Sequence, residues 1–227
     1  QGITAAVPVS VYARALGVSE EKLYRALIIS NLSTIHIKEG IGRLSAYCGA
    51  VGAGCGCGAA ISYLYGGGLK DGSHAIVNGL AIVSGMICDG ANASCAAKIA
   101  SAVDAGILGY FMYRDGQQFV GGDGIVKKGV ENTIRCVGQL ASEGMLETDK
   151  EIVKLMTKEI VKRVKENMNI DINFTDDAIT LIAKDGFDPA YGARPLRREL
   201  QSRVEDRFAE EFLNGAIKNG ENVVIDA

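Results

Sequence analysis

The sequence predicts a mainly α-helical protein that ends in a small α+β domain. Residues 1–148 hold 25 of the 29 glycines, all 6 cysteines and only 22 charged residues, whereas the remaining 79 positions hold 29 charged residues. Helical spacing of apolar residues dominates before residue 149, and the alternation typical of strands is absent there. Because one core seldom changes composition so abruptly, we expect two domains. Residues 1–148 would form a buried Gly/Ala-rich helical domain, and residues 149–227 a small domain with a charged exterior.

The first domain is predicted to consist of successive helices. The first spans Ala5–Leu16 and ends at Gly17, and Pro8 is tolerable only in its first turn. Ser19 caps the next helix, whose first turn is acidic. Further helical stretches and turns follow: helices over 43–65, 75–87, 93–113 and 124–143, and turns at 66–68 and 71–72. The alternating glycines between 52 and 58 fit either close helix packing or a loop around a bulky group.

The second domain has the pattern of a long helix followed by a strand–helix–helix–strand unit. The long helix is amphipathic and spans Lys150–Asn167. The elements after it are a strand over Ile170–Phe174, a helix that Thr175 caps and Gly186 ends, a helix over 195–214, and a strand over Asn222–Asp226. This order predicts a compact α+β unit.

Charge and hydropathy exclude several classes of protein. The formal net charge is −3 and the sequence pI is about 5.5, which argues against non-specific nucleic-acid binding. No apolar run reaches the roughly 20 residues of a membrane span. The chain starts at Gln1 with no secretory signal, so we expect a cytoplasmic protein with no nucleic-acid or membrane partner. The absent initiator Met indicates that the chain begins inside a longer protein.

The cysteines give the first chemical signal. Without an export signal a disulfide framework is not expected, and small buried hydrophobes are as good an explanation as ligands. Two contexts favour ligation: Cys88 and Cys95 flank a polar turn, and Cys48 precedes a Gly-rich stretch. The paired C-x2-C knuckles of zinc sites are absent, and separated cysteines suit an iron–sulfur cluster better.

Three motifs in residues 1–150 resemble conserved blocks of the L-cysteine desulfidase family, which is related to the alpha chain of iron–sulfur L-serine dehydratase. They are GITA at 2–5, GRLSAYCG at 42–49 and SGMICDGA at 84–91. The resemblance implies a [4Fe-4S] cluster held by Cys48, Cys88 and Cys95. It also implies β-elimination from L-cysteine or L-serine, with release of ammonia and pyruvate. Only the C-terminal part of the family is matched, and the family's catalytic base lies outside it. We therefore expect little or no lyase turnover from this chain alone, and no catalytic residue is assigned.

The motif GFDPAYGARPLRR at 186–198 resembles the small C-terminal lid of Clp-type AAA+ unfoldases. This resemblance covers about residues 150–227 and implies that Arg194 senses the γ-phosphate of ATP bound by a large AAA+ subdomain. No G-x-x-x-x-G-K-[ST] phosphate loop occurs in the sequence, so ATP would bind only with that absent subdomain. An alternative function is therefore an ATP-sensing and oligomerisation module of a Clp unfoldase or chaperone, with a structural N-terminal part and a large AAA+ subdomain or further copies as partners. A purely structural two-domain protein is a third hypothesis.

Overall fold

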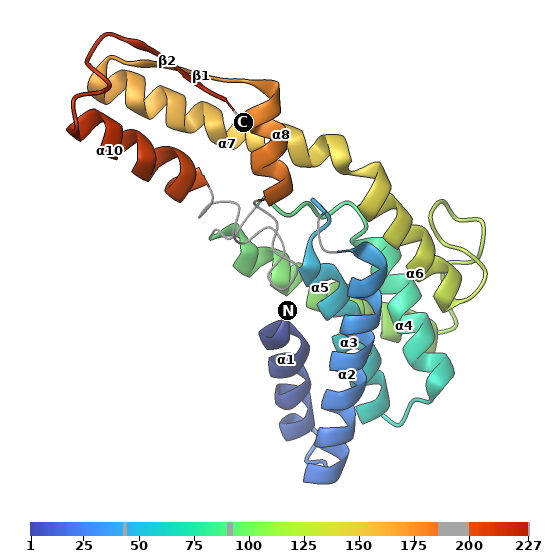
Figure 1. Ribbon diagram of the computed structural model, residues 1–227. Helices are drawn as coiled ribbons and strands as arrows, with labels where there is room; N and C mark the ends of the chain where they lie inside the picture. Colours follow the sequence, from blue (N-terminus) through green and yellow to red (C-terminus); the bar gives the residue numbers. More distant parts are fainter. Residues whose placement is uncertain (43–44, 90–92, 186–199, 227) are drawn as a thin grey trace. The chain divides into compact units, whose positions relative to one another are not determined.

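The computed structural model describes residues 1–42, 45–89, 93–185 and 200–226, and it confirms a mainly helical fold with a small sheet near the C-terminus (Figure 1). The chain divides into two compact units. The first unit comprises Gln1–Gly42, Tyr47–Cys88 and the residues from 93 to Gly144 among those described. The second contains everything from Met145 onward, together with Ser45, Ala46 and Asp89.

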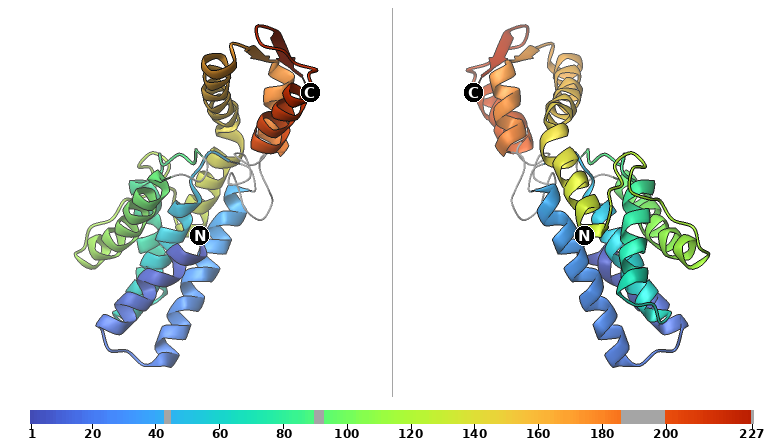
Figure 2. Two further views of the ribbon diagram at one scale, coloured as in Figure 1. Left: turned by 90° about the vertical axis from the view of Figure 1, so that its left-hand side faces the viewer. Right: turned by 90° about the vertical axis from the view of Figure 1, so that its right-hand side faces the viewer.

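The first unit is a helical bundle built around α3 (Figures 1 and 2). Almost every residue of α3 is buried, because α1, α2, α4 and α5 all pack against it. The elements are α1 (Gly2–Ala15), α2 (Glu20–Ile41), α3 (Gly49–Leu64), α4 (Leu69–Ile82), α5 (Ser94–Arg114), α6 (Val130–Gln139) and the π-helical turn η1 (Leu140–Gly144).

The alternating glycines of α3 allow close approach of two neighbouring helices. A Cβ on Gly54 would lie 2.2 Å from the Ala102 carbonyl oxygen on α5, and a Cβ on Gly56 would lie 2.6 Å from the Ser30 carbonyl oxygen on α2. Residues four apart share a helix face, whereas residues two apart point to nearly opposite faces. Gly54 and Gly58 therefore contact α5, and Gly52 and Gly56 contact α2. Of the two alternatives left by the sequence, close helix packing is the one observed.

Buried side-chain hydrogen bonds fix the neighbouring helices and one loop. The Ser30 hydroxyl on α2 donates to the Ala5 carbonyl oxygen on α1 at 2.7 Å. Asn78 on α4 is fully buried; its amide donates to the Gly109 carbonyl oxygen at 2.9 Å, and its side-chain oxygen accepts from the Phe119 amide at 3.1 Å. Asn78 thus ties α4 to α5 and to the loop after α5.

Two predicted boundaries in this unit are wrong for identifiable reasons. Residues 71–72 are predicted to form a turn, but they lie in α4, which starts at Leu69. The Asp71 carboxylate accepts a hydrogen bond of 2.9 Å from the Gly68 amide and so caps the start of this helix. The helix predicted over 124–143 begins only at Val130, because Gly124 and Gly129 have φ values of +59° and +86°, which a right-handed helix does not allow.

Two smaller features also differ from expectation. Pro8 lies inside α1 rather than in its first turn, so α1 lacks one backbone hydrogen bond there. Tyr47 and Ile87 form an isolated antiparallel bridge in a region where no strand pairing is predicted. A single bridge is too short to produce an alternating sequence pattern.

The second unit has the predicted order of a long helix and an α+β unit (Figure 1). Its described elements are α7 (Leu146–Met168), β1 (Asp171–Phe174), α8 (Asp176–Asp185), the π-helical segment η2 (Gln201–Asp206), α10 (Arg207–Leu213) and β2 (Asn222–Ile225). The strands pair in parallel, with Asp171 opposite Asn222. The Thr175 hydroxyl accepts a hydrogen bond of 3.1 Å from the Ala178 amide and so caps α8 as predicted. The core contains Val153, Ile160, Ile179, Ile182, Leu200 and Val204.

Among the described helices, α5 is long and apolar enough to cross a membrane when judged by length and composition alone. The sequence analysis finds no such run because Lys98 and Asp104 interrupt the apolar residues of α5. Core helices pass the same test, and α5 packs closely on α3 and α4 through Ala102, Ala105, Gly106 and Gly109. Its composition is therefore weak evidence for a membrane span.

We predict that Gly54→Ala lowers the free energy of unfolding by about 3 kcal/mol, because its Cβ would meet the α5 backbone rather than a movable side chain. The matched control is Gly72→Ala in α4, where the nearest atoms would lie 3.6 Å from the new Cβ. This control should raise the free energy of unfolding by up to about 1 kcal/mol, since alanine favours helices over glycine. Urea denaturation measures both. Equal effects of the two substitutions would contradict close packing of α3 on α5.

We also predict that Asn78→Ala lowers the free energy of unfolding by about 2 kcal/mol, because it removes a fully buried amide and leaves the partly buried Phe119 amide without its hydrogen-bond acceptor. Asn132→Ala is the control: the Asn132 amide also donates to a backbone carbonyl oxygen, at 2.8 Å, but in an exposed position. The control should change the free energy by no more than about 0.5 kcal/mol. Thermal unfolding followed by circular dichroism distinguishes the two outcomes.

Candidate functional site

Cys48 and Cys88 lie side by side in the first unit, although 40 residues separate them in sequence. The isolated bridge between Tyr47 and Ile87 brings the two segments together, and the Cys48 amide donates to the Met86 carbonyl oxygen at 3.0 Å. The two thiols form a side-chain hydrogen bond. Cys48 is buried and occupies the N-cap position of α3. Two of the three predicted ligands are therefore adjacent.

Two lysines approach this thiol pair from other helices. Lys38 on α2 interacts electrostatically with both thiols, and Lys98 on α5 interacts with Cys48. The hydrogen bond with Cys88 and burial raise the pKa of the Cys48 thiol, while the charge of Lys98 opposes this shift. Burial lowers the pKa of the Lys38 ammonium, against the influence of the two cysteines. Negative charge on sulfur would therefore be stabilised here by two cations.

Cys95 is the second residue of α5 and is half-buried. The contacts of Gly54 with Ala102 and of Gly58 with Gly106 show that α3 and α5 run parallel in a fixed register. Continued to the start of both helices, this register brings Cys48 level with the first turn of α5, where Cys95 and Lys98 lie one turn apart. Within the described ranges no group of three Cys, His, Asp or Glu side chains has the arrangement of a metal site. The assignment of all three cysteines as ligands remains a prediction.

The donor chemistry of this region fits an iron–sulfur cluster. Thiolates are the protein ligands that such clusters use, and the adjacent Cys48 and Cys88 supply two. Cys48 caps α3 and Cys95 opens α5, so each lies at the positive end of a helix, where thiolate character is favoured. A zinc site of His and Cys ligands is a poorer fit, since His36 and His74 have other partners. His36 pairs with Glu131 at 2.8 Å, and His74 stacks on Tyr113.

The other cysteines have different surroundings. Cys55 and Cys57 are fully buried within α3, and burial raises the pKa of each thiol to about 12. They remain protonated and fill space in the Gly/Ala core. Cys136 is partly exposed on α6.

Sequence reasoning did not find Lys38 and Lys98. Lys98 could have been found, because it follows Cys95 by three residues on a predicted helix and therefore shares its face. Lys38 carries no such signal. It belongs to a different helix from all three cysteines, and only the packing of α2 on α3 brings it to the thiols.

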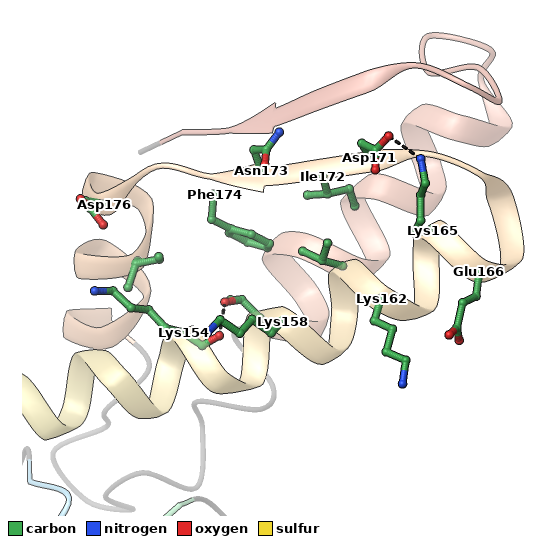
Figure 3. Close-up of a pocket in the computed structure, with 13 residues that line it drawn as sticks. Lys154, Lys158, Lys162, Lys165, Glu166, Asp171, Ile172, Asn173, Phe174 and Asp176 are labelled. Atoms are coloured by element: carbon green, nitrogen blue, oxygen red, sulfur yellow. Dashed lines mark hydrogen bonds and ion pairs between the residues drawn. The ribbon is translucent and has the colours of Figure 1, made fainter.

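The second unit contains a separate groove of about 630 Å³ between α7, β1 and the start of α8 (Figure 3). Its floor is apolar and includes Ile172 and Phe174. Lysines of α7 line it at positions 154, 158, 162 and 165. Lys165 pairs with Asp171 on β1, whereas Lys162 points away from the strand. Because Asp171, Asp176 and Glu166 also line the groove, its charges are largely balanced. Arg194, the predicted nucleotide sensor, lies outside the described residues.

Two family profiles match this chain, and the boundary between them lies near residue 149, where the composition changes. The profile of the family described as serine dehydratase alpha chain matches residues 1–154. The profile described as the C-terminal, D2-small domain of ClpB protein matches residues 146–225. The two matches overlap within the first part of α7.

Curated relatives match the first part of the chain and are described as UPF0597 proteins. The relative from Desulfitobacterium hafniense is 65% identical over 156 residues, which is 69% of this chain and 36% of the relative. Relatives from Treponema denticola and Lachnoclostridium phytofermentans are 54% and 56% identical, over 70% and 69% of this chain and 37% of each relative. This chain thus spans little more than a third of their length. Since the family profile covers well over half of the chain, the protein belongs to the serine dehydratase alpha chain family.

Proposed function

We propose that residues 1–148 are the cluster-bearing part of an iron–sulfur lyase that eliminates the β-substituent of L-serine or L-cysteine, releasing ammonia and pyruvate. The observation that carries the proposal is the adjacent pair Cys48 and Cys88 with Lys38 and Lys98 beside it. This combination of thiols and cations occurs in a chain of the serine dehydratase alpha chain family.

Cys48, Cys88 and Cys95 would hold a [4Fe-4S] cluster, which supplies an open iron as a Lewis acid toward the leaving group. The chain's own residues would do the rest of the positioning. Lys38 and Lys98 place positive charge next to the thiolates and offer a partner for the carboxylate of an amino-acid substrate. The starts of α3 and α5 add the positive ends of two helix dipoles.

Removal of the substrate's α-proton requires a base that this chain does not clearly provide. The described histidines are engaged in other contacts: His36 pairs with Glu131, and the ring centroids of His74 and Tyr113 lie 4.1 Å apart. We therefore assign the base to the part of the family protein that has no counterpart in this chain.

Anaerobic reconstitution with iron and sulfide tests the cluster assignment. We expect Cys48→Ser, Cys88→Ser and Cys95→Ser each to reduce bound iron several-fold, because each removes one thiolate ligand. Cys136→Ser is the matched control and should retain the iron, since Cys136 lies on α6 and is not a proposed ligand. Iron and sulfide per chain, with the visible absorbance of the cluster, are the measurements. Equal iron in all four variants would refute the assignment.

The same reconstituted chain should form little or no pyruvate from L-serine or L-cysteine, because it lacks the base. The control is the full-length D. hafniense relative, reconstituted in parallel. Pyruvate formation by this chain that Cys88→Ser abolishes would place the base within residues 1–148. The prediction of cluster binding and the prediction of little turnover can therefore be refuted separately.

For residues 149–227 we propose a second function, that of a Clp-type AAA+ lid and interaction module that senses ATP through Arg194. Its support is the ClpB D2-small match over residues 146–225, together with the long helix and two-stranded parallel sheet of this unit. A lid without its large subdomain has no phosphate-binding loop, so it contributes only a sensing arginine.

The lid function predicts that the chain alone shows no measurable ATP binding by isothermal titration calorimetry, because the groups that hold the phosphates are absent. When a Clp protein supplies the large subdomain in the same chain, with residues 149–227 replacing its own lid, ATPase activity should depend on Arg194. Arg194→Ala should lower kcat at least tenfold, and Arg203→Ala is the control. ATP binding by the isolated chain that Arg194→Ala removes would contradict this proposal.

A further inference from the structure

The outer faces of α1 and α2 are apolar. On α1 the side chains of Ile3, Val7 and Val11 are 77%, 52% and 56% exposed. On α2 those of Ile28, Leu32 and Ile35 are 58%, 60% and 54% exposed. These six residues, the α1/α2 face, recur at spacings of three or four, so they form one stripe along each helix.

The two stripes lie on neighbouring helices that both cover α3. The buried residues Val9, Ala13 and Ala26 of these helices share a core cluster with Cys57 and Ile61 of α3. α1 and α2 run antiparallel side by side and also pack against each other (Figures 1 and 2). Since each stripe is on the side of its helix opposite to the buried residues, both stripes face away from α3.

Charge is absent along most of this layer. No Lys, Arg, Asp or Glu occurs in residues 1–13 or in residues 26–37. Charged groups border the layer at both ends: Glu21 pairs with Arg25 near the connection between the helices, and His36, one turn after Leu32, pairs with Glu131 on α6. Scattered exposed apolar residues are ordinary, whereas a contiguous apolar layer bordered by charge marks a contact surface.

The length of the relatives suggests an occupant for this layer. The matched region is only 36% to 37% of each relative cited above, so nearly two thirds of each relative has no counterpart in this chain. In the relatives this additional polypeptide belongs to the same chain as the helical unit, so it is available to pack against it. The α1/α2 face is a large uncharged surface of the unit on which such packing removes aliphatic side chains from water.

We propose that the α1/α2 face is the docking surface for the part of a serine dehydratase alpha chain family protein that this chain lacks. The occupant is a polypeptide with a complementary apolar surface, either covalently continuous, as in the long relatives, or supplied as a separate chain. This proposal rests on family membership and surface chemistry, and it holds whether or not the unit binds a cluster.

One substitution made in two intact proteins tests the proposal. In this chain Leu32→Glu places a carboxylate on an exposed position, so Tm should change by no more than about 2 °C. In the full-length D. hafniense relative, Glu at the position aligned with Leu32 would be buried under the additional polypeptide, and Tm should fall by about 8 °C or more. Arg25→Glu and the aligned change in the relative form the control. It adds a carboxylate at the charged end and should shift Tm by about 2 °C or less in both proteins.

A fall in Tm confined to the relative and to the Leu32 position supports the proposal. Equal small shifts in both proteins would overturn it, because the face would then be exposed in the whole family protein. Size-exclusion chromatography with light scattering tests the alternative occupant, which is a second copy of this chain. If this chain is a dimer that Leu32→Glu converts to monomer while the relative is insensitive, the face binds a second copy and the proposal is wrong. These readouts do not involve lyase activity, so they fail independently of the proposed function.

Discussion

The close approach of α3 to its neighbours is the constraint on which the first unit depends. Interleaved glycines let the α3 backbone contact α2 on one side and α5 on the other, where a Cβ on Gly54, Gly56 or Gly58 would overlap backbone atoms. The helices pair in the register in which these glycines face the neighbouring backbones. That register brings the start of α3, the last turns of α2 and the first turn of α5 together. Cys48, Lys38 and Lys98 meet there for this reason.

The charges around Cys48 and Cys88 determine what this site could bind. The hydrogen bond with Cys88 and burial raise the pKa of the Cys48 thiol, so by itself this sulfur does not readily become a thiolate. The charge of Lys98 opposes that shift. Lys38 and the N-termini of α3 and α5 add positive charge that favours a bound group with negative charge on sulfur. Cys55 and Cys57 lack such partners and serve packing instead.

Two features of the first unit are consistent with the proposals made for it. The thiol site has candidate ligands and cations without an evident base, and the α1/α2 face presents aliphatic side chains to water without a cover. Both fit a chain that spans little more than a third of its relatives' length. The second unit, with its ClpB-like sequence, has its own core and its own groove. It is therefore a compact unit with a core of its own.

The sequence by itself determined the helical class, the composition change near residue 149, the Ser19 and Thr175 caps and both family resemblances, because these depend on local spacing and short motifs. It also singled out Cys48 and Cys88. Only the tertiary structure decided that these two thiols are adjacent, that Lys38 joins them, and which way the glycines face. Helical periodicity marks a buried face without saying which partner covers it, and a single bridge such as Tyr47–Ile87 leaves no pattern. Contacts between residues far apart in the chain depend on packing, which local sequence patterns do not encode.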